Sequence, residues 1–242
     1  MTELSLLQIL LANLAILAGA CLQGVAGYGI GTLSAPLLFL VSPMLLPAPL
    51  ILNAILLTVM MLIRNRASLG FREVRFAIAG DVVGTLLAGL TLMALSGPSF
   101  SLVFGVLVLL AVALSLVGVR PRLTPASSLV AGAASGYMGT ITAVGGPPIA
   151  MIYQNERGPL VRANMSAFFL FASCASVAML AFSGYIGRTE LGLFVVMLPG
   201  MVAGFLLSGL LVHRMPFGAL RPLILAIAAA GGLAALVRGL TG

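Results

Sequence analysis

Two stretches of the sequence place glycine, hydroxyl side chains and proline inside otherwise apolar segments. The first, residues 22–38, is LQGVAGYGIGTLSAPLL, and the second, residues 136–150, is GYMGTITAVGGPPIA. Glycine lets a membrane helix break, and the N–H groups exposed where a helix resumes attract anions. We therefore predict a small-anion site near the middle of the membrane, formed by Gly29, Gly31, Thr32, Ser34, Thr142, Gly145 and Gly146.

The prolines of the two stretches indicate where each second half-helix begins. Proline suits the first helical turn because its missing N–H would have no helical partner there. Pro36 in the first stretch, and Pro147 and Pro148 in the second, are therefore predicted to lie near such a start. Non-helical backbone is tolerated at membrane depth only where it lines a cavity or is packed in protein. The alternative is that these glycines only allow close helix packing.

Three polar residues inside other apolar segments are further candidates. Asn53 and Asn164 lie at matching places in the two halves of the chain. Their amides fit anion contact, and they fit hydrogen bonding between helices equally well. Asp81 is the only acid deep in an apolar segment, which makes it a candidate for carrying a coupling proton. The alternative is a structural acid that reaches interfacial water or pairs with Arg75.

The residue inventory argues against metal binding and catalysis. The chain has one histidine and two cysteines, and Cys21 and Cys174 lack metal-ligand spacing. We predict neither a metal nor a cofactor. There is no nucleophile–base pattern and no pair of intramembrane acids, so we expect that the protein is not an enzyme.

The composition is typical of a membrane protein. Of the 242 residues, 61% are hydrophobic and 7% are charged, whereas soluble domains are about a quarter charged. The net charge of +7 comes from arginines scattered between apolar segments, which indicates membrane topology and not nucleic-acid binding. Ten apolar segments are expected at 4–22, 31–41, 45–63, 76–96, 99–119, 126–140, 146–155, 163–183, 191–212 and 217–237.

The second half of the chain repeats the first. Residues 24–36 match residues 136–148 at an offset of 112, and other glycines, an asparagine and a proline match at similar offsets. We predict repeats at 1–122 and 123–242, each a glycine-broken or re-entrant helix pair followed by three transmembrane helices. Close helix packing is expected at the paired glycines Gly80, Gly84 and Gly89 and Gly200, Gly204 and Gly209.

The arginines favour one orientation of the repeats. If each broken pair returns to the side from which it enters, each half makes three crossings and the halves are inverted. If it crosses, the halves are parallel. Inverted halves place every arginine except Arg188 and Arg238 on one side, which satisfies the positive-inside rule better. That arrangement puts the N-terminus outside.

The two glycine stretches resemble the motifs that open each half of the sulfite exporter TauE/SafE family. They match as GVAGYGIGTLSAPLL and GYMGTITAVGGPPIA, and the resemblance covers nearly the whole chain. The second motif is the closer one, because Ser34 and Ala35 stand where the family has a denser glycine run. The resemblance implies movement of sulfite, organosulfonates or related small anions across the bacterial inner membrane.

We therefore expect an all-α, multi-pass integral membrane protein of two inverted repeats. Its expected function is secondary transport of small, sulfur-containing anions by alternating access, with proton coupling left open. An uncoupled channel for anions or other solutes is the alternative. The expected partners are a small anionic substrate and the lipid bilayer, without nucleic acid, and homo-oligomerisation is left open.

Overall fold

The protein is all helical throughout the part that the structure describes. This computed structural model describes residues 4–65, 71–95, 97–117, 121–153, 159–211 and 217–241. The α-helices are α1 (Leu6–Ala26), α2 (Ile30–Val41), α3 (Ala48–Asn65), α4 (Phe71–Ala94), α5 (Gly97–Val117), α6 (Pro125–Thr142), α7 (Gly146–Ile152), α8 (Pro159–Phe182), α9 (Arg188–Leu211) and α10 (Phe217–Thr241), with a short 3-10 helix, η1 (Pro43–Leu45). Each predicted apolar segment coincides with one of the ten α-helices.

Seven of the described helices are long and apolar enough to cross a membrane. They are α1, α3 with η1, α4, α5, α8, α9 and α10. Helices α2 and α7 are shorter, with 12 and 7 residues. At about 1.5 Å per residue neither spans the roughly 30 Å apolar core of a bilayer. The chain is therefore a multi-pass membrane protein that contains two short helices.

Each short helix folds back against the helix before it. Gln8 on α1 donates a hydrogen bond to the Val41 carbonyl at the end of α2, 3.2 Å away. Further along the pair, the Ser34 hydroxyl donates to the Ala15 carbonyl at 2.8 Å. Early residues of α1 thus contact late residues of α2, so the two helices are antiparallel and form a hairpin. Helix α7 likewise packs on α6.

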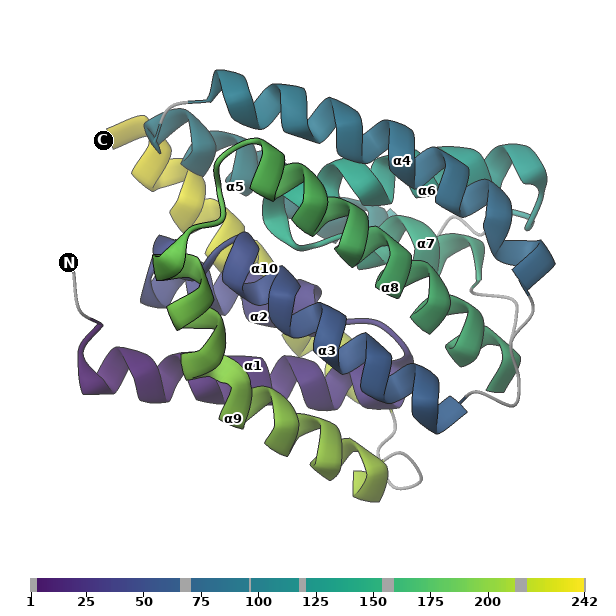
Figure 1. Ribbon diagram of the computed structural model, residues 1–242, viewed down its shortest axis with the longest axis horizontal. Helices are drawn as coiled ribbons and strands as arrows, with labels where there is room; N and C mark the ends of the chain where they lie inside the picture. The colour runs from purple at the N-terminus through teal and green to yellow at the C-terminus, as the bar shows by residue number, and fades with distance from the viewer. Residues whose placement is uncertain are drawn as a thin grey trace.

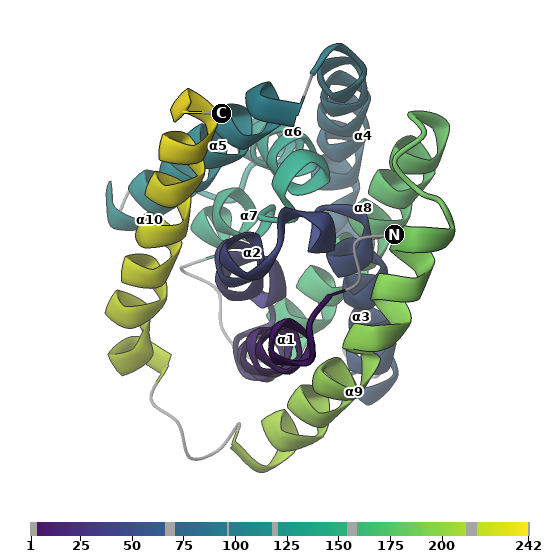
Figure 2. The ribbon, with the colours of Figure 1, turned by 90° about the vertical axis from the view of Figure 1, so that its left-hand side faces the viewer.

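The helices of the two halves exchange partners reciprocally. Helix α4 packs on α6, and α9 packs on α1. Helix α3 packs on α8 and α9, while α8 packs on α3 and α4, and α5 packs on α10. Figures 1 and 2 show the short helices α2 and α7 inside a ring of longer helices, with the start of α1 and the end of α10 near the same end of the bundle.

Glycines allow the closest of these helix pairs. A Cβ at Gly80 or Gly84 of α4 would overlap the backbone of α6. A Cβ at Gly200 or Gly204 of α9 would overlap the backbone of α1 in the same way. Small residues let membrane helices approach to backbone contact, which confirms the packing role predicted for these four positions. The paired Gly89 and Gly209 face side chains instead.

The prediction for Pro36 is wrong in one respect, because this proline lies in the interior of α2 and not at its start. The helix break is set earlier, by Gly27 and Gly29, whose φ angles are 89° and 132°. Glycine adopts such left-handed conformations without a steric penalty. Pro147, by contrast, lies in the first turn of α7, as predicted.

Candidate functional site: a cavity between two helix breaks

The two helix breaks meet in the interior of the bundle. A Cβ at Gly31, in the first turn of α2, would overlap the carbonyl oxygen of Ala143, which ends α6. A Cβ at Gly146, where α7 starts, would lie 3.0 Å from the Tyr28 ring and 3.2 Å from the Thr32 hydroxyl oxygen. Ala143 has a left-handed φ of 62°. Two stretches more than 100 residues apart in the sequence are thus in direct contact.

A cavity of about 60 Å³ lies at this meeting point. One water needs about 15 Å³ on this measure, so the cavity has room for roughly four atoms of that size. That is close to the size of sulfite or of the head group of a sulfonate. Its lining comes from both breaks and from α3, α4 and α8, and its polar or glycine members include Gln23, Gly29, Gly31, Thr32, Thr58, Asp81, Ser135, Gly139, Gly145, Gly146, Ser173 and Ser176.

Gln23 and Ser135 hold the two breaks in shape. The Gln23 side-chain oxygen accepts a hydrogen bond from the N–H of Ile30 at 3.1 Å, across the first break. The Ser135 hydroxyl donates to the Gly145 carbonyl at 2.6 Å, across the second. The two residues are separated by the repeat offset of 112 and stand one position before Gly24 and Gly136. Side chains at equivalent positions therefore form a hydrogen bond across the helix break in each half.

The start of α2 presents hydrogen-bond donors to the cavity. The first N–H groups of a helix have no partner inside it, and they carry the positive end of the helix dipole. Gln23 satisfies Ile30, and the Leu33 N–H bonds the Gly29 carbonyl at 3.1 Å. Between them lie Gly31 and Thr32, which both line the cavity. The Thr32 hydroxyl is buried and has no hydrogen-bond partner among the described residues.

Asp81 is the one acidic side chain among the described residues that line the cavity. It is 0% exposed, and neither carboxylate oxygen has a hydrogen-bond partner in the described part of the chain. A position in interfacial water does not fit this burial. Nor does a pair with Arg75, whose guanidinium lies over the Phe76 ring at 4.6 Å. A buried acid without a hydrogen-bond donor is costly when it is ionised.

The structure gathers six of the ten predicted site residues around the cavity. They are Gly29, Gly31, Thr32, Asp81, Gly145 and Gly146. The other four have different surroundings. Ser34 bonds the Ala15 carbonyl of α1, and the Thr142 hydroxyl bonds the Met138 carbonyl and the Val144 N–H around the end of α6.

The two asparagines are buried outside the cavity lining. The Asn53 amide donates to the Pro49 carbonyl at 3.0 Å and to the Phe194 carbonyl of α9 at 3.2 Å. This arrangement matches the alternative of hydrogen bonding between helices. Asn164 is 1% exposed, and it too does not line the cavity.

Sequence reasoning missed several polar lining residues. Gln23 lies inside the first glycine stretch and Ser135 directly precedes the second, so the repeat offset that separates them could have identified both. Thr58, Ser173 and Ser176 line the cavity from α3 and α8. Isolated hydroxyl residues in apolar helices usually pack or bond their own backbone, and nothing in the sequence marks these three as different. The Ser176 hydroxyl in fact shares a hydrogen bond of 2.7 Å with Thr140.

A comparison against protein families gave a match that covers most of the chain. A sequence model of the sulfite exporter TauE/SafE family matches residues 11–235. The chain belongs to the sulfite exporter TauE/SafE family. Searches of curated proteins and of solved structures gave no significant match. As a TauE/SafE protein with seven apolar spans, the chain is a membrane protein of a family associated with transport of sulfur-containing anions.

Membership of the TauE/SafE family is consistent with a role in transport. The described residues hold no group of three or more His, Cys, Asp and Glu side chains that could bind a metal ion. His213 lies outside the described residues, and Arg162 lies in the first turn of α8. The chemistry that the cavity does offer is hydrogen-bond donation to a small anion and one buried acid beside it.

Proposed function

We propose that this protein is a secondary transporter that moves small, sulfur-containing anions across the bacterial inner membrane by alternating access. The observation that carries the proposal is the cavity where the two helix breaks touch. The N–H groups at the start of α2 and the Thr32 hydroxyl would bind the anion's oxygens. Hairpins from the two halves would close the cavity from opposite sides, so one binding site would have two gates.

The path of the chain supports two inverted repeats, at 1–122 and 123–242. Each half consists of a hairpin with a short second helix and three longer helices. Five successive helices that alternate in direction bring the chain to the opposite end of the bundle, so α6 starts opposite α1 (Figure 1). The reciprocal packing of α4 on α6 and of α9 on α1 is what a twofold relation between the halves would produce.

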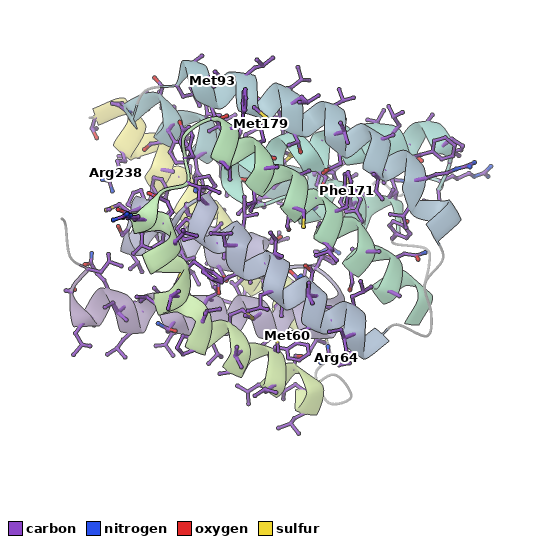
Figure 3. The ribbon with its side chains drawn as sticks, in the orientation of Figure 1. Met60, Arg64, Met93, Phe171, Met179 and Arg238 are labelled. Atoms are coloured by element: carbon purple, nitrogen blue, oxygen red, sulfur yellow. The ribbon has the colours of Figure 1, made fainter. Side chains whose placement is uncertain are left out.

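The arginines support an orientation with both termini outside. Figure 3 shows Arg64 and Arg238 at opposite ends of the molecule. Arg221 bonds the Ser115 carbonyl near the end of α5, which leads to Arg122 before α6. The end that holds Arg64, Arg122 and Arg221 would face the cytoplasm.

Asp81 would couple transport to protons. An anion and an ionised carboxylate in one small cavity repel each other, whereas a protonated acid does not. Anion and proton would therefore be bound and released together. The second half has Met201 at the position that corresponds to Asp81, since Gly80 and Gly200 share the offset of 120. A single coupling acid would thus serve the site that both halves form.

Transport by the full chain in liposomes tests the proposal. We expect saturable accumulation of sulfite or methanesulfonate that follows an imposed pH gradient. Gly146→Leu should abolish it, because the added side chain would extend toward Tyr28 and Thr32 and fill the cavity. Gly192→Leu is the matched control, because a Cβ there meets nothing within 4 Å.

The outcomes separate the alternatives. Flux that rises linearly with anion concentration and ignores the pH gradient would indicate the uncoupled channel. Absence of flux for the whole panel of sulfite, sulfonates, thiosulfate and carboxylates would refute anion transport. Unchanged flux in a correctly folded Gly146→Leu variant would place the substrate path elsewhere.

A further inference from the structure

A second cavity adjoins the central one and opens toward the Arg221 end of the bundle. Its volume is about 210 Å³, and Tyr28, Ser115, Ala150 and Arg221 are among its lining residues. Gly29 and Thr32 line both cavities. The first helix break is therefore the wall between them, and a ligand would need only a movement around that break to pass from one to the other.

Arg221 is the only charged side chain among the described residues that line this second cavity. It is exposed, and its guanidinium donates to the Ser115 carbonyl of α5. Because a guanidinium has five N–H donors, this one bond leaves donors for a ligand. Tyr28 lines the same cavity.

The cavity at the opposite end of the bundle has no such connection through the described residues that line it. The cavity there is lined by residues that include Pro47, Phe100, Tyr185 and Arg238, and it shares no lining residue with the central cavity. An arginine at the mouth of a cavity thus occurs at both ends. Of these two cavities, as the described residues line them, the Arg221 cavity alone shares a wall with the central cavity.

We propose that the second cavity is an anion vestibule, in which Arg221 attracts small oxyanions and delivers them to the central cavity past Tyr28 and Thr32. A planar guanidinium binds two oxygens of a sulfite or sulfonate group, and a cleft of one sign of charge concentrates ions of the other. At about 210 Å³ the vestibule accepts a hydrated anion or a short organosulfonate, whereas the central cavity holds only the head group. The proposal rests on the proposed function for its substrate.

The competing role of Arg221 is structural. A cation bonded to a carbonyl in the last turn of a helix stabilises that helix end, and cytoplasmic arginines also set topology. Neither role requires that the cavity prefer anions. The charge preference of the cavity is therefore the property to measure.

A cysteine at position 150 can report that preference without any transport. In the full chain with Cys21→Ala and Cys174→Ser, Ala150→Cys places a small thiol in the vestibule wall. Its reaction rates with anionic sulfonatoethyl and cationic trimethylammonioethyl methanethiosulfonates give a rate ratio. We expect Arg221→Gln to lower the anionic-to-cationic ratio about tenfold. The matched control Arg122→Gln removes an exposed arginine that does not line the cavity, and it should leave the ratio unchanged.

Salt provides a second measurement in the protein that retains Arg221. The ratio should fall toward one as ionic strength rises from about 0.01 M to about 1 M, because the Debye length shrinks from about 30 Å to about 3 Å. An unlabelled cysteine at position 150, or a ratio unaffected by Arg221→Gln and by salt, would overturn the vestibule. A ratio that responds as expected, in a protein that transports no anion, would refute the proposed function and leave the anion-selective cavity standing.

Discussion

Replacing Asp81 by asparagine should remove most of the pH dependence of anion binding. The amide keeps the size of the side chain beside Gly136, where a Cβ would lie 2.9 Å from the carboxylate oxygen, so the packing of α4 on α6 should survive. The amide cannot ionise. Binding in the wild type should tighten as pH falls, because protonation of Asp81 removes its repulsion of the anion, and binding in Asp81→Asn should not.

The size of the effect follows from the cavity. A sphere of about 60 Å³ has a radius of about 2.4 Å. With about 3 Å added for the contact with the wall atoms, an anion at its centre lies roughly 5.5 Å from a carboxylate in the wall. At an effective dielectric constant of about 20, two unit charges at that distance repel by about 3 kcal/mol. This energy corresponds to about a hundredfold in Kd. The wild-type Kd should therefore change about a hundredfold across the titration of Asp81, and by at most tenfold per pH unit.

The assay is isothermal titration calorimetry of the purified full chain with methanesulfonate at several pH values. A sulfonate suits this test because it remains singly charged throughout the range, whereas sulfite itself takes up a proton. Glu190→Gln is the control, because it removes a negative charge that caps α9 through the Gly187 N–H and lies outside the cavity lining. Parallel pH profiles for wild type and Asp81→Asn, or a wild-type Kd that does not change with pH, would show that Asp81 does not face the bound anion.

Two other predictions test the hairpins and the orientation. Gly31→Ala should destabilise the protein by about 1–3 kcal/mol, measured as a lower thermal unfolding midpoint, because its Cβ would overlap the Ala143 carbonyl, while Gly192→Ala should cost far less. An unchanged midpoint for Gly31→Ala would contradict the contact between the two breaks. Reporter fusions at the N-terminus and at the C-terminus should both report the outer side of the membrane, and a cytoplasmic signal from either would contradict the inverted arrangement.

The sequence by itself determined the class of protein and the positions of its helices. Long apolar segments separated by arginine, glycine and proline can satisfy their backbone groups in lipid only as helices. The pattern of apolar segments along the chain therefore predicts the ten helices. The glycine breaks were also predicted, because Gly27 and Gly29 in the first half, and Gly145 and Gly146 in the second, lie near polar residues in the sequence. These properties are local, and they do not depend on which helices become neighbours.

The repeat offset predicted part of the tertiary structure, because it paired residues that make equivalent contacts in the two halves. It paired the glycines that bring α4 against α6 and α9 against α1, and it also pairs Gln23 with Ser135 across the two breaks. A duplicated unit folds twice in the same way, so a contact made by one half predicts a contact of the other. Asp81 was identified for a different reason, since an acid in lipid is costly wherever its helix lies.

Only the tertiary structure decided which polar side chains face the cavity. Successive residues point about 100° apart around a helix, and the packing of the neighbouring helices sets the rotation. Thr32 therefore lines the cavity while Ser34, two residues later, bonds α1. The start of α2 was decided in the same way: Gln23 reaches across the break to the Ile30 N–H, which leaves Pro36 in the helix interior. Such contacts join residues through space, so no local pattern of residue types can specify them.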